Sequence, residues 1–434
     1  MKPKSLSNSR RGFLKSAAVL AGSIAIVPRY VLGRGYVAPS DKIALGFIGI
    51  GKQTRGLVSR FIEQTPIEVV AGSDVFASKR AWFEQWVSEK YTQYREKKGR
   101  EGIATYLEYE ALLDRDDIDG VVIVTPDHWH AIQAIAAMKA GKDVYCEKPL
   151  AHTIKEGRAI VEATQKYGRV LQTGSMQRSN ANFRHACELV RNGYLGKVEK
   201  VLATVGAPET PYALAAEDMP AGLDWDRWCG PGPLAAYHHT LAPDTVDTQF
   251  WPDWRKFTEF GGGILCDWGA HMFDIAQWGL GMDESGPVQW IPPTDPKAVR
   301  GLRMVYANGV EMVHEDFGRG WAVRFIGEKG SLDVSRQFLD SQPENIAGAK
   351  IKKSETHLYE SKNHYLDWLD AVKNRTSPIC NAETGHRSAS VCNLANIAYH
   401  LNRPLEWNPA TEKFAGDGEA NKLLTKKYRK PYKL

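Results

Sequence analysis

The stretch VVIVTPDHWHAIQAIAAMKAGKDVYCEKPL, residues 121–150, predicts one complete strand–helix–strand unit. Its first four residues are apolar and β-branched, which is typical of a strand covered on both faces in a parallel sheet. The helix that follows is expected to be capped by Asp127 and to stop at Gly141, because glycine adopts the left-handed conformation easily. Residues 143–146 should form a second strand, parallel to the first.

The two strands of this unit should end at the same edge of the sheet, because a helical crossover connects parallel neighbours. Residues 125–130 and 147–149 therefore emerge side by side. Doubly wound folds bind their ligands at this edge, so both segments are candidate site residues.

A glycine turn precedes this unit and predicts a nucleotide site. Residues 42–50 form a buried strand that enters Gly49-Ile50-Gly51 and then an amphipathic helix. Gly49 permits the tight turn, and Gly51 lets backbone amides approach a pyrophosphate at the helix N-terminus. Thr54 occupies the usual place of a third glycine, whose packing role we assign in part to Gly56.

An acidic residue follows at the spacing expected for a ribose-binding carboxylate. The next strand, 67–73, ends in Asp74. Strand, glycine turn, helix, strand and acid in that order favour a dinucleotide over a purely structural glycine turn. The charge of Asp74 would repel a 2′-phosphate, which favours NAD, while Lys79 and Arg80 keep NADP as the alternative.

The second half of the chain has a different periodicity. In residues 197–205 apolar and charged positions alternate, which indicates an antiparallel sheet with one covered face. Asn308-Gly309 predicts a hairpin between two further strands. Matching strands are expected at 301–306, 310–315, 322–327 and 331–334, and helices at 180–192, 365–372 and 386–401.

We therefore predict a Rossmann domain of the α/β class over residues 41–174. Residues 175–434 should form an α+β domain with a large, mostly antiparallel open sheet and with C-terminal helices that pack back on the core. The basic C-terminal end, from Lys426 to Lys433, is interpreted as a solvated tail.

An irregular segment between the strands of the second domain is rich in aromatic residues. Tryptophans at this density in loops are either core residues or stacking surfaces for sugar rings, and the sequence favours neither interpretation. The residues concerned are Trp225, Trp228, Tyr237, Trp251, Trp254 and Phe257.

The N-terminus carries a twin-arginine export motif, Ser9-Arg10-Arg11-Gly12-Phe13-Leu14-Lys15. The modest apolar run that follows, 16–27, is shorter than the roughly 20 residues of a membrane span. Residues 1–33 are expected to be a signal segment with a weak cleavage site near Val31-Leu32-Gly33, so anchoring by an uncleaved signal is the alternative. The prediction is a periplasmic protein that the twin-arginine machinery exports in folded form.

The charge balance argues against a nucleic-acid partner. The formal charge is +5, but residues 1–33 contain six basic and no acidic residues, so the remainder carries a formal charge of −1. A nearly neutral body lacks the basic surface that nucleic acids require. The six cysteines form no CxxC pair, and most of them are expected to be buried free thiols.

Two motifs resemble the Gfo/Idh/MocA family of oxidoreductases. Glu147-Lys148-Pro149 follows the Rossmann core, and Asp267-Trp268-Gly269-Ala270-His271 lies in the second domain. The resemblance covers essentially the whole chain after the signal and is greatest for exported bacterial members with the patterns TPDHWHA and GGG..DWGAH.FDIAQW.LGMD. Either motif alone would be weak evidence, whereas the two together are specific.

The resemblance implies roles for individual residues. Lys148 corresponds to the lysine that hydrogen-bonds the reacting hydroxyl, and Pro149 to the proline that positions it, often through a cis peptide. Asp267 and His271 correspond to the substrate-binding acid and the catalytic histidine. The expected cofactor-binding residues are Gly49, Gly51, Lys52, Gln53, Asp74, Thr125, Pro126, His128, His130, Glu147, Lys148 and Gln177.

These roles agree with the chemistry of alcohol oxidation. A hydroxyl carbon loses a hydride to nicotinamide and a proton to a base, and histidine is a natural proton acceptor near neutral pH. Lys148 can stabilise the developing alkoxide charge. Asp267 and His271 are four residues apart, so on a helix they share a face and the carboxylate can orient the imidazole.

Each assignment has a structural alternative. Without the resemblance, His271 would be interpreted as a satisfied core histidine, and Lys148 as a surface lysine at a strand end. The corresponding alternative for His128 and His130 is helix capping and packing. We expect these two histidines to border the nicotinamide without taking part in the chemistry.

No metal is predicted. A metal site made of His128, His130, Asp267 and His271 is disfavoured, because hydride transfer to a cofactor needs none. His238-His239 is interpreted as an exposed loop pair, with contact to substrate as its alternative.

The favoured function is that of an NAD(P)-dependent dehydrogenase or reductase acting on a CH–OH group of a sugar, glycoside or cyclitol. The first alternative is an NAD-dependent glycoside-cleaving enzyme, in which transient oxidation of a sugar carbon permits elimination. Related glycosidases tend to have lost the lysine that Lys148 matches, which ranks this function second. The third is a nucleotide-binding protein without turnover, which the intact Lys148, Asp267 and His271 disfavour.

Export leads to one further expectation, and the second sheet to another. Free NAD is scarce in the periplasm, so the cofactor should be tightly held and recycled. A homo-oligomer, a dimer or a tetramer, is expected through the open face of the antiparallel sheet, because an apolar sheet face seldom stays bare.

Overall fold

The computed structural model describes residues 42–64, 67–95 and 102–434. The twin-arginine motif and its predicted cleavage site lie outside these residues. In the described part, no helix is both long enough and apolar enough to cross a membrane.

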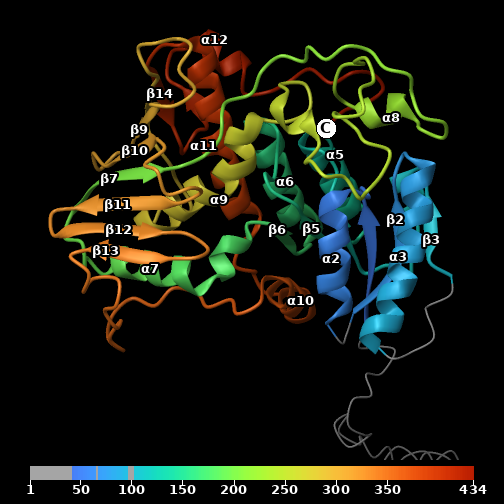
Figure 1. Ribbon diagram of the computed structural model, residues 1–434, viewed down its shortest axis with the longest axis horizontal. Helices are drawn as coiled ribbons and strands as arrows, with labels where there is room; N and C mark the ends of the chain where they lie inside the picture. Colours follow the sequence, from blue (N-terminus) through green and yellow to red (C-terminus); the bar gives the residue numbers. More distant parts are fainter. Residues whose placement is uncertain (1–41, 65–66, 96–101) are drawn as a thin grey trace, which may run out of the picture. The chain divides into compact units, whose positions relative to one another are not determined.

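The first part of the fold is a parallel sheet of six strands in the order β3-β2-β1-β4-β5-β6 (Figure 1). The helices α2 and α3 contact β2, and α5 contacts β4 and β5. Its elements are β1 Ile43–Ile48, α2 Lys52–Ile62, β2 Ile67–Ser73, α3 Ala77–Arg95, β3 Ala104–Tyr106, α4 Tyr109–Leu113, β4 Gly120–Ile123, α5 Asp127–Lys139, β5 Asp143–Cys146, α6 Ile154–Tyr167 and β6 Leu171–Thr173.

The unit around residues 121–150 has the predicted form. Strands β4 and β5 are parallel, with Val121 opposite Val144, and Gly141 ends the helix with a φ of 80°. The predicted role of Asp127 as the helix cap is wrong. Pro126 holds the cap position without a side-chain hydrogen bond, and Asp127 is the first residue of α5, with its carboxyl group buried.

The glycine turn after β1 is held by a hydroxyl in place of the third glycine. Gly49 has a φ of 89°. The Thr54 hydroxyl donates to the carbonyl oxygen of Gly49 at 2.8 Å and accepts from the amide of Gly51 at 3.1 Å. Gly56, the residue expected to take over the packing role, is exposed, and a Cβ there would meet no atom within 4 Å. That assignment is therefore wrong, and Thr54 stabilises the turn instead.

The second part of the fold is a sheet of nine strands in the order β13-β12-β11-β7-β10-β9-β8-β14-β15. All of its pairings are antiparallel except that of β7 with β10. Its strands are β7 Val198–Ala203, β8 Gln289–Ile291, β9 Arg303–Val305, β10 Glu311–His314, β11 Val323–Gly327, β12 Gly330–Val334, β13 Leu339–Gln342, β14 Leu405–Asn408 and β15 Lys413–Phe414.

Helices cover one face of this sheet, where α9 contacts β7 and β11 and α7 contacts β12 and β13. Gly309, with a φ of 84°, makes the predicted turn between β9 and β10. The helical elements of this part are η3 Met176–Ser179, α7 Ala181–Arg191, α8 Trp225–Cys229, η4 Asp253–Lys256, α9 Gly263–Leu280, α10 His364–Asn374, α11 Ala382–Leu401 and α12 Gly418–Lys422. The predicted fold class, a Rossmann sheet followed by a mostly antiparallel sheet, is confirmed.

Two late helices join the sheets. Helix α10 places Trp368 edge-on against Tyr145 of β5 and Phe61 of α2, and α11 packs on both α6 and α9. All six cysteines are buried and free, as expected.

The C-terminal end is packed against the protein, which contradicts its interpretation as a solvated tail. The ammonium of Lys426 donates to the Thr258 carbonyl at 2.6 Å and lies 2.8 Å from Nε2 of His152. The ring of Tyr432 meets Trp129 edge-on at 5.3 Å. Lys426 and Arg429 therefore bind carbonyl groups of the protein, whereas Lys427, Lys430 and Lys433 are exposed.

Candidate active site

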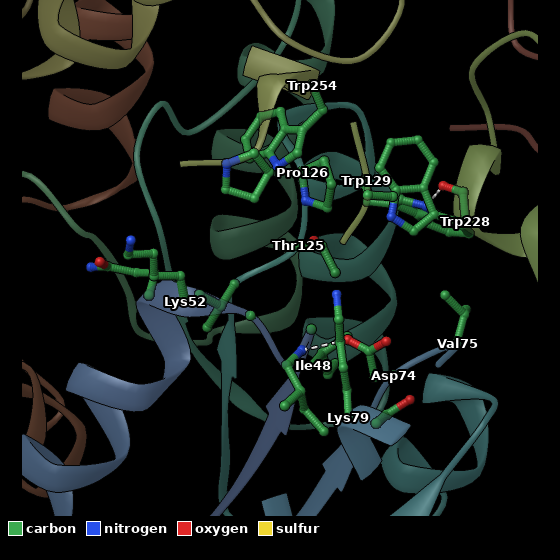
Figure 2. Close-up of a pocket in the computed structure, with 18 of the residues that line it drawn as sticks. Ile48, Lys52, Asp74, Val75, Lys79, Thr125, Pro126, Trp129, Trp228 and Trp254 are labelled. Carbon is green, nitrogen blue, oxygen red and sulfur yellow. Dashed lines mark hydrogen bonds between the residues drawn. The ribbon is translucent and has the colours of Figure 1, made fainter. Parts of the chain in front are cut away.

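A crevice opens at the carboxyl edge of the parallel sheet, where the sequence places the nucleotide. We call it the cofactor crevice; Figure 2 shows residues that line it. The β1–α2 turn, the end of β2 and the β4–α5 turn all contribute to its wall. Of the predicted cofactor-binding residues, Gly49, Gly51, Lys52, Gln53, Asp74, Thr125 and Pro126 line it.

The backbone of the crevice fits a dinucleotide. A Cβ at Gly49 would lie 2.7 Å from the Thr125 amide nitrogen, so only glycine lets the two turns approach this closely. The amides of Gly49 and Ile50 are used internally, by the Ser73 carbonyl and the Asp74 carboxylate. The amide of Gly51 donates to the Thr54 hydroxyl. The amides of Lys52 and Gln53, which start α2, have no acceptor in the described part of the chain, and such amides bind phosphate oxygens.

Asp74 and Lys79 lie together at the base of the crevice (Figure 2). The Asp74 carboxylate accepts from the amides of Ile50 and Phe76 at 2.7 and 2.9 Å. Burial raises the pKa of Asp74, and Lys79 opposes that rise; burial also lowers the pKa of Lys79. The crevice thus offers a carboxylate for a ribose hydroxyl and, beside it, an ammonium for a 2′-phosphate, so both NAD and NADP retain a binding group.

Residues 207–262, which we call the insertion, lie over this crevice. The ammonium of Lys52 donates to the Thr248 carbonyl at 2.7 Å, and Arg55 forms an ion pair with Asp247. Lys52 was expected to bind the cofactor. Its charged end is instead bound to the insertion, so the insertion is tied to the helix whose N-terminus forms the phosphate site.

The aromatic residues of the insertion divide into two groups. Trp225, Trp228, Tyr237 and Phe257 are buried in one cluster, whereas Trp251 is 51% exposed and lines the crevice together with Trp254. The core interpretation is therefore confirmed for the four buried residues, whereas a stacking role for Trp251 and Trp254 stays a prediction.

A second cavity, of about 700 Å³, adjoins the crevice. We call it the reaction cavity. The two share a wall that includes Gln53, Thr125, Trp254 and Arg255. Its volume suits a monosaccharide or a small glycoside. Lys148, Asp267 and His271 all line it, so the structure brings together the three residues predicted to carry the chemistry.

Lys148 and Asp267 form an ion pair in this cavity. The Lys148–Pro149 peptide is cis, and the Lys148 ammonium donates to the Asp267 carboxylate at 2.6 Å and to its backbone carbonyl at 3.0 Å. Burial alone would raise the pKa of Asp267, but Lys148 and Arg255 outweigh it and lower the pKa to about 2. At neutral pH this carboxylate is therefore ionised and holds the ammonium at the cavity wall.

His271 lies one turn further along α9, with its ring buried beside Trp268. Burial, Lys148 and Arg336 lower its pKa well below 6.5, so the imidazole is neutral at pH 7 and able to accept a proton. The expectation that Asp267 orients this ring is wrong here. Asp267 and His271 share a helix face, but in the described chain no hydrogen bond joins them, because the carboxylate is bound to Lys148.

Sequence reasoning missed Asp127 and Arg255. Asp127 lines the reaction cavity, and burial raises its pKa to about 8, so it carries a proton at neutral pH. Nε of Arg255 lies 3.5 Å from the Asp267 carboxylate, and its guanidinium stacks over Trp254 at 4.2 Å. A carboxylate after a helix cap residue and an arginine in a short 3-10 helix carry no sequence signal of their own, because the fold alone brings them here.

Glu147 is buried and lines the reaction cavity rather than the cofactor crevice. It accepts from the Gln53 amide at 3.1 Å, and burial raises its pKa. It therefore connects the strand end at Lys148 with the start of α2.

His128 and His130 do not line either cavity, contrary to the expectation that they border the nicotinamide. Both ring nitrogens of His128 lie 3.2 Å from carbonyl oxygens of the insertion, those of Phe260 and Trp228. The two ring nitrogens of His130 lie 2.8 and 2.9 Å from the carbonyl oxygens of Pro149 and Thr125. Burial lowers the pKa of each to about 4. These rings pack behind the site and connect its loops, as their structural alternative proposed.

Gln177 is also placed differently from the prediction. It lines neither the crevice nor the reaction cavity but a third space, of about 420 Å³, which we call the side cavity. Arg336 and Tyr365 line both the side cavity and the reaction cavity, so the two adjoin.

His238 and His239 meet Glu217 on the surface of the insertion. Nδ1 of His239 lies 2.9 Å from the carboxylate, and Nε2 of His238 lies 3.3 Å from it. In the described part of the chain this is the group whose ligand atoms lie close enough together to hold a metal ion. Two histidines of the disfavoured metal site are occupied otherwise, since both nitrogens of His128 and of His130 face backbone carbonyls.

Comparisons with known proteins agree with this architecture. Residues 43–175 match the model of the oxidoreductase family's NAD-binding Rossmann fold, and residues 207–434 match that of its C-terminal alpha/beta domain. These are models of the Gfo/Idh/MocA family. Because the second match alone covers more than half of the chain, the chain belongs to this family.

One curated relative is an alpha-N-acetylgalactosaminidase of Shewanella oneidensis, 32% identical over 213 residues; the match covers 44% of either chain, less than half the length of this relative. The aldose-aldose oxidoreductase from Caulobacter crescentus has a similar fold, with a TM-score of 0.57 at 20% identity, covering 84% of this chain and 99% of that one. The WlbA dehydrogenase from Bordetella pertussis, solved with NADH and UDP-GlcNAcA, has a TM-score of 0.57 at 16% identity, covering 85% and 99%.

Proposed function

We propose that this Gfo/Idh/MocA protein is an NAD(P)-dependent dehydrogenase or reductase that acts on a CH–OH group of a sugar, glycoside or cyclitol. The observation that carries the proposal is the convergence of Lys148, Asp267 and His271 on one cavity that shares a wall with the cofactor crevice. When bound, the nicotinamide supplies a hydride acceptor or donor.

The residues of the chain perform the proton chemistry. The Lys148 ammonium hydrogen-bonds the substrate hydroxyl and stabilises negative charge on its oxygen, while Asp267 holds that ammonium in place. The neutral imidazole of His271 accepts the hydroxyl proton. Trp254 and Arg255 line both cavities and exclude water from the space between substrate and cofactor.

The test is a screen of sugars and glycosides for formation of reduced nicotinamide by purified protein. Lys148→Ala and His271→Ala should each remove the activity that the screen finds. Lys353→Ala and His400→Ala, which change exposed residues of the same types, are the matched controls. Activity that survives both site variants would contradict the proposal.

We propose NAD rather than NADP, tightly held. The Asp74 carboxylate supports NAD, and the insertion bound to Lys52 and Arg55 supports slow release of a cofactor beneath it. Protein purified without added nucleotide should carry NAD(H), measured by absorbance and by enzymatic assay after denaturation. A preparation that contains no nucleotide and binds none would contradict this part of the proposal.

A second candidate function is supported by the relative named alpha-N-acetylgalactosaminidase. In an oxidation–elimination reaction, a glycoside is oxidised at a sugar carbon, loses its leaving group and is reduced again, so nicotinamide shows no net change. Nitrophenyl glycosides separate the two functions: nitrophenol release without net NADH indicates cleavage, whereas NADH and keto-sugar formed in equal amounts indicate a dehydrogenase.

We further propose export to the periplasm by the twin-arginine route, with cleavage or retention of residues 1–33 as the open alternative. The motif at Ser9 to Lys15 supports it, and a folded passenger would load its cofactor in the cytoplasm first. Replacing Arg10-Arg11 by Lys-Lys should retain the protein in the cytoplasm, as cell fractionation would reveal.

A homo-oligomer through the outer face of the nine-stranded sheet completes the proposal. Half-buried Leu202 and Ile326 lie on this face beside Lys200 and Arg324, and Arg324 pairs with Asp333 across the strands at 2.6 Å. Such a mixed surface suits a polar interface. Light scattering after size exclusion measures the assembly, and a monomer would contradict the proposal.

A further inference from the structure

The side cavity is open toward the reaction cavity and is rich in hydrogen-bond donors. Arg60, Met176, Arg336 and Tyr365 line both cavities. No residue that lines the side cavity also lines the cofactor crevice. A ligand group in the side cavity therefore belongs to the substrate and not to the phosphates of the cofactor.

Three cations face this space without acidic partners. In the described part of the chain, no carboxylate lies within ion-pair distance of Arg60, Arg336 or Lys362. Glu63, the acid that lines the cavity, is hydrogen-bonded to the hydroxyl of Tyr94. This excess of positive charge is local, because residues 34–434 carry a formal charge of −1.

Arg336 is held in position by neutral groups. Its guanidinium stacks over Trp268 at 5.2 Å. The side-chain oxygen of Gln177 faces this guanidinium and accepts from Nε and Nη2 of Arg336 at 3.1 and 2.9 Å. Neither contact neutralises the charge, so the guanidinium keeps its full charge and its remaining donors for a ligand.

Two side-chain amides add donors to the same wall. The oxygen of Asn180 accepts from the Asn182 amide at 2.9 Å, and that of Asn363 accepts from the Tyr365 amide at 3.0 Å. Both oxygens serve as caps of helices, which leaves the NH₂ groups as the free ends of these amides. A cavity lined by cations and NH₂ groups favours an anion, because an anion accepts from all of them.

We propose that the side cavity binds an anionic substituent of the substrate, a carboxylate, sulfate or phosphate on the sugar, while its hydroxyl carbon lies at Lys148 and His271. This inference rests on the proposed function, since it names the substrate class of the same site. Arg336 is its specificity-determining residue, with Arg60 and Lys362 as supporting charges. A planar guanidinium with three free N–H donors suits a carboxylate or a tetrahedral oxyanion.

Binding measured by calorimetry with NAD(H) present tests the proposal without any need for turnover. The probes are methyl glycosides of the gluco and galacto series in four forms: neutral, 6-carboxylate, 6-sulfate and 6-phosphate. At least one anionic form should bind about tenfold or more tightly than its neutral counterpart, as expected for a charge-assisted pair. The preference should shrink as salt is raised, and the preferred form identifies the anion.

Arg336→Gln should reduce this preference for the anionic form about tenfold or more, and Arg336→Lys should restore part of it. Lys353→Gln, which removes an exposed cation elsewhere, should leave the preference unchanged. Equal binding of neutral and anionic forms in both series, no binding of any form, or a preference that Arg336→Gln does not alter would overturn the inference.

A turnover assay with the same probes separates this inference from the proposed function. Oxidation of neutral and anionic glycosides at equal efficiency would contradict the proposed anion subsite but leave the proposed dehydrogenase function intact. If Arg336→Gln loses the binding preference but no probe reduces nicotinamide, the result would support the anion subsite and contradict the proposed dehydrogenase function.

Discussion

The cofactor crevice and the reaction cavity share a wall, but they differ in the kind of group on which their proposed function depends. The predicted phosphate site of the crevice is made of backbone, by the β1–α2 turn, the neighbouring β4–α5 turn and the amides that start α2. The reaction cavity is made of charged side chains that come from α5, the end of β5, the insertion and α9. A region made of backbone depends on conformation and small side chains, whereas a region made of charges depends on the identity of each group.

Among the substitutions that test this difference between the two regions, we expect the largest effect from one at Lys148. Lys148→Ala removes the ammonium proposed to stabilise the substrate oxygen, and we expect kcat to fall about 10²–10³-fold, as for loss of one preorganised donor. The cofactor's Kd should change less than threefold, because the crevice is separate. Steady-state kinetics measure kcat, and nucleotide titration measures the Kd of the cofactor. A large loss of cofactor affinity would show that the two regions are not independent.

Gly49→Ala tests the other region. The added methyl group would lie 2.7 Å from the Thr125 amide nitrogen at a φ of 89°, so we expect a loss of stability of about 1–3 kcal/mol and a cofactor Kd at least tenfold higher. Gly56→Ala is the matched control, because that glycine is exposed and helical, and there the substitution should stabilise by up to about 1 kcal/mol. Denaturant titration and nucleotide binding distinguish them. An unaffected Gly49→Ala protein would refute the backbone account of the crevice.

A pH dependence of stability is expected from Asp127 in the reaction cavity. Asp127 has a pKa of about 8 in the folded protein against 3.8 as its ordinary value, so between these values the folded state retains a proton that the unfolded state has lost. Stability should therefore decrease as pH rises from 4 to 8. Asp127→Asn, which cannot ionise, should show less of this decrease in thermal melts. Identical pH profiles for the two proteins would contradict the assignment.

The same variant bears on catalysis. kcat/KM should change near pH 8 as Asp127 loses its proton beside Asp267, and this change should be absent in Asp127→Asn. Between pH 7 and 6 no loss is expected, because the pKa of His271 lies well below 6.5 and its imidazole stays neutral. Activity that falls with a midpoint near 6.5 would contradict the burial of His271.

The smallest effect is expected from Thr54→Val. This change keeps the shape of the side chain but removes its hydrogen bonds to the carbonyl oxygen of Gly49 and the amide of Gly51. The loss should be about 1 kcal/mol, a shift of a few degrees in Tm. A loss of several kcal/mol would mean that the turn depends on a side chain as much as the reaction cavity does.

Periodicity and turn chemistry made most of the fold predictable from the sequence. Buried runs, the glycine turn and the Asn308-Gly309 hairpin each report local backbone preferences, so their elements appear where expected. The short strands β8, β14 and β15 were missed, because two to four residues hold too little periodicity. Their pairing depends on neighbours far along the chain.

The candidate site was predictable where motifs carry it, as at Lys148, Asp267 and His271. Asp127 and Arg255 could not be assigned, because their chemistry arises from burial and from contacts that only the tertiary fold creates. His128 and His130 were misplaced for a related reason. A histidine at a sheet edge can face the ligand or the layer behind it, and sequence spacing does not distinguish the two.

The C-terminal segment is synthesised long after the residues that it contacts in the first half of the chain. Lys426 reaches His152 across 274 residues, and Tyr428 reaches Glu156 across 272. At about 5–20 residues per second, a ribosome needs roughly 14–55 s to synthesise the stretch between them. His152 and Glu156 therefore gain these two contacts only after residues 426–428 have been synthesised.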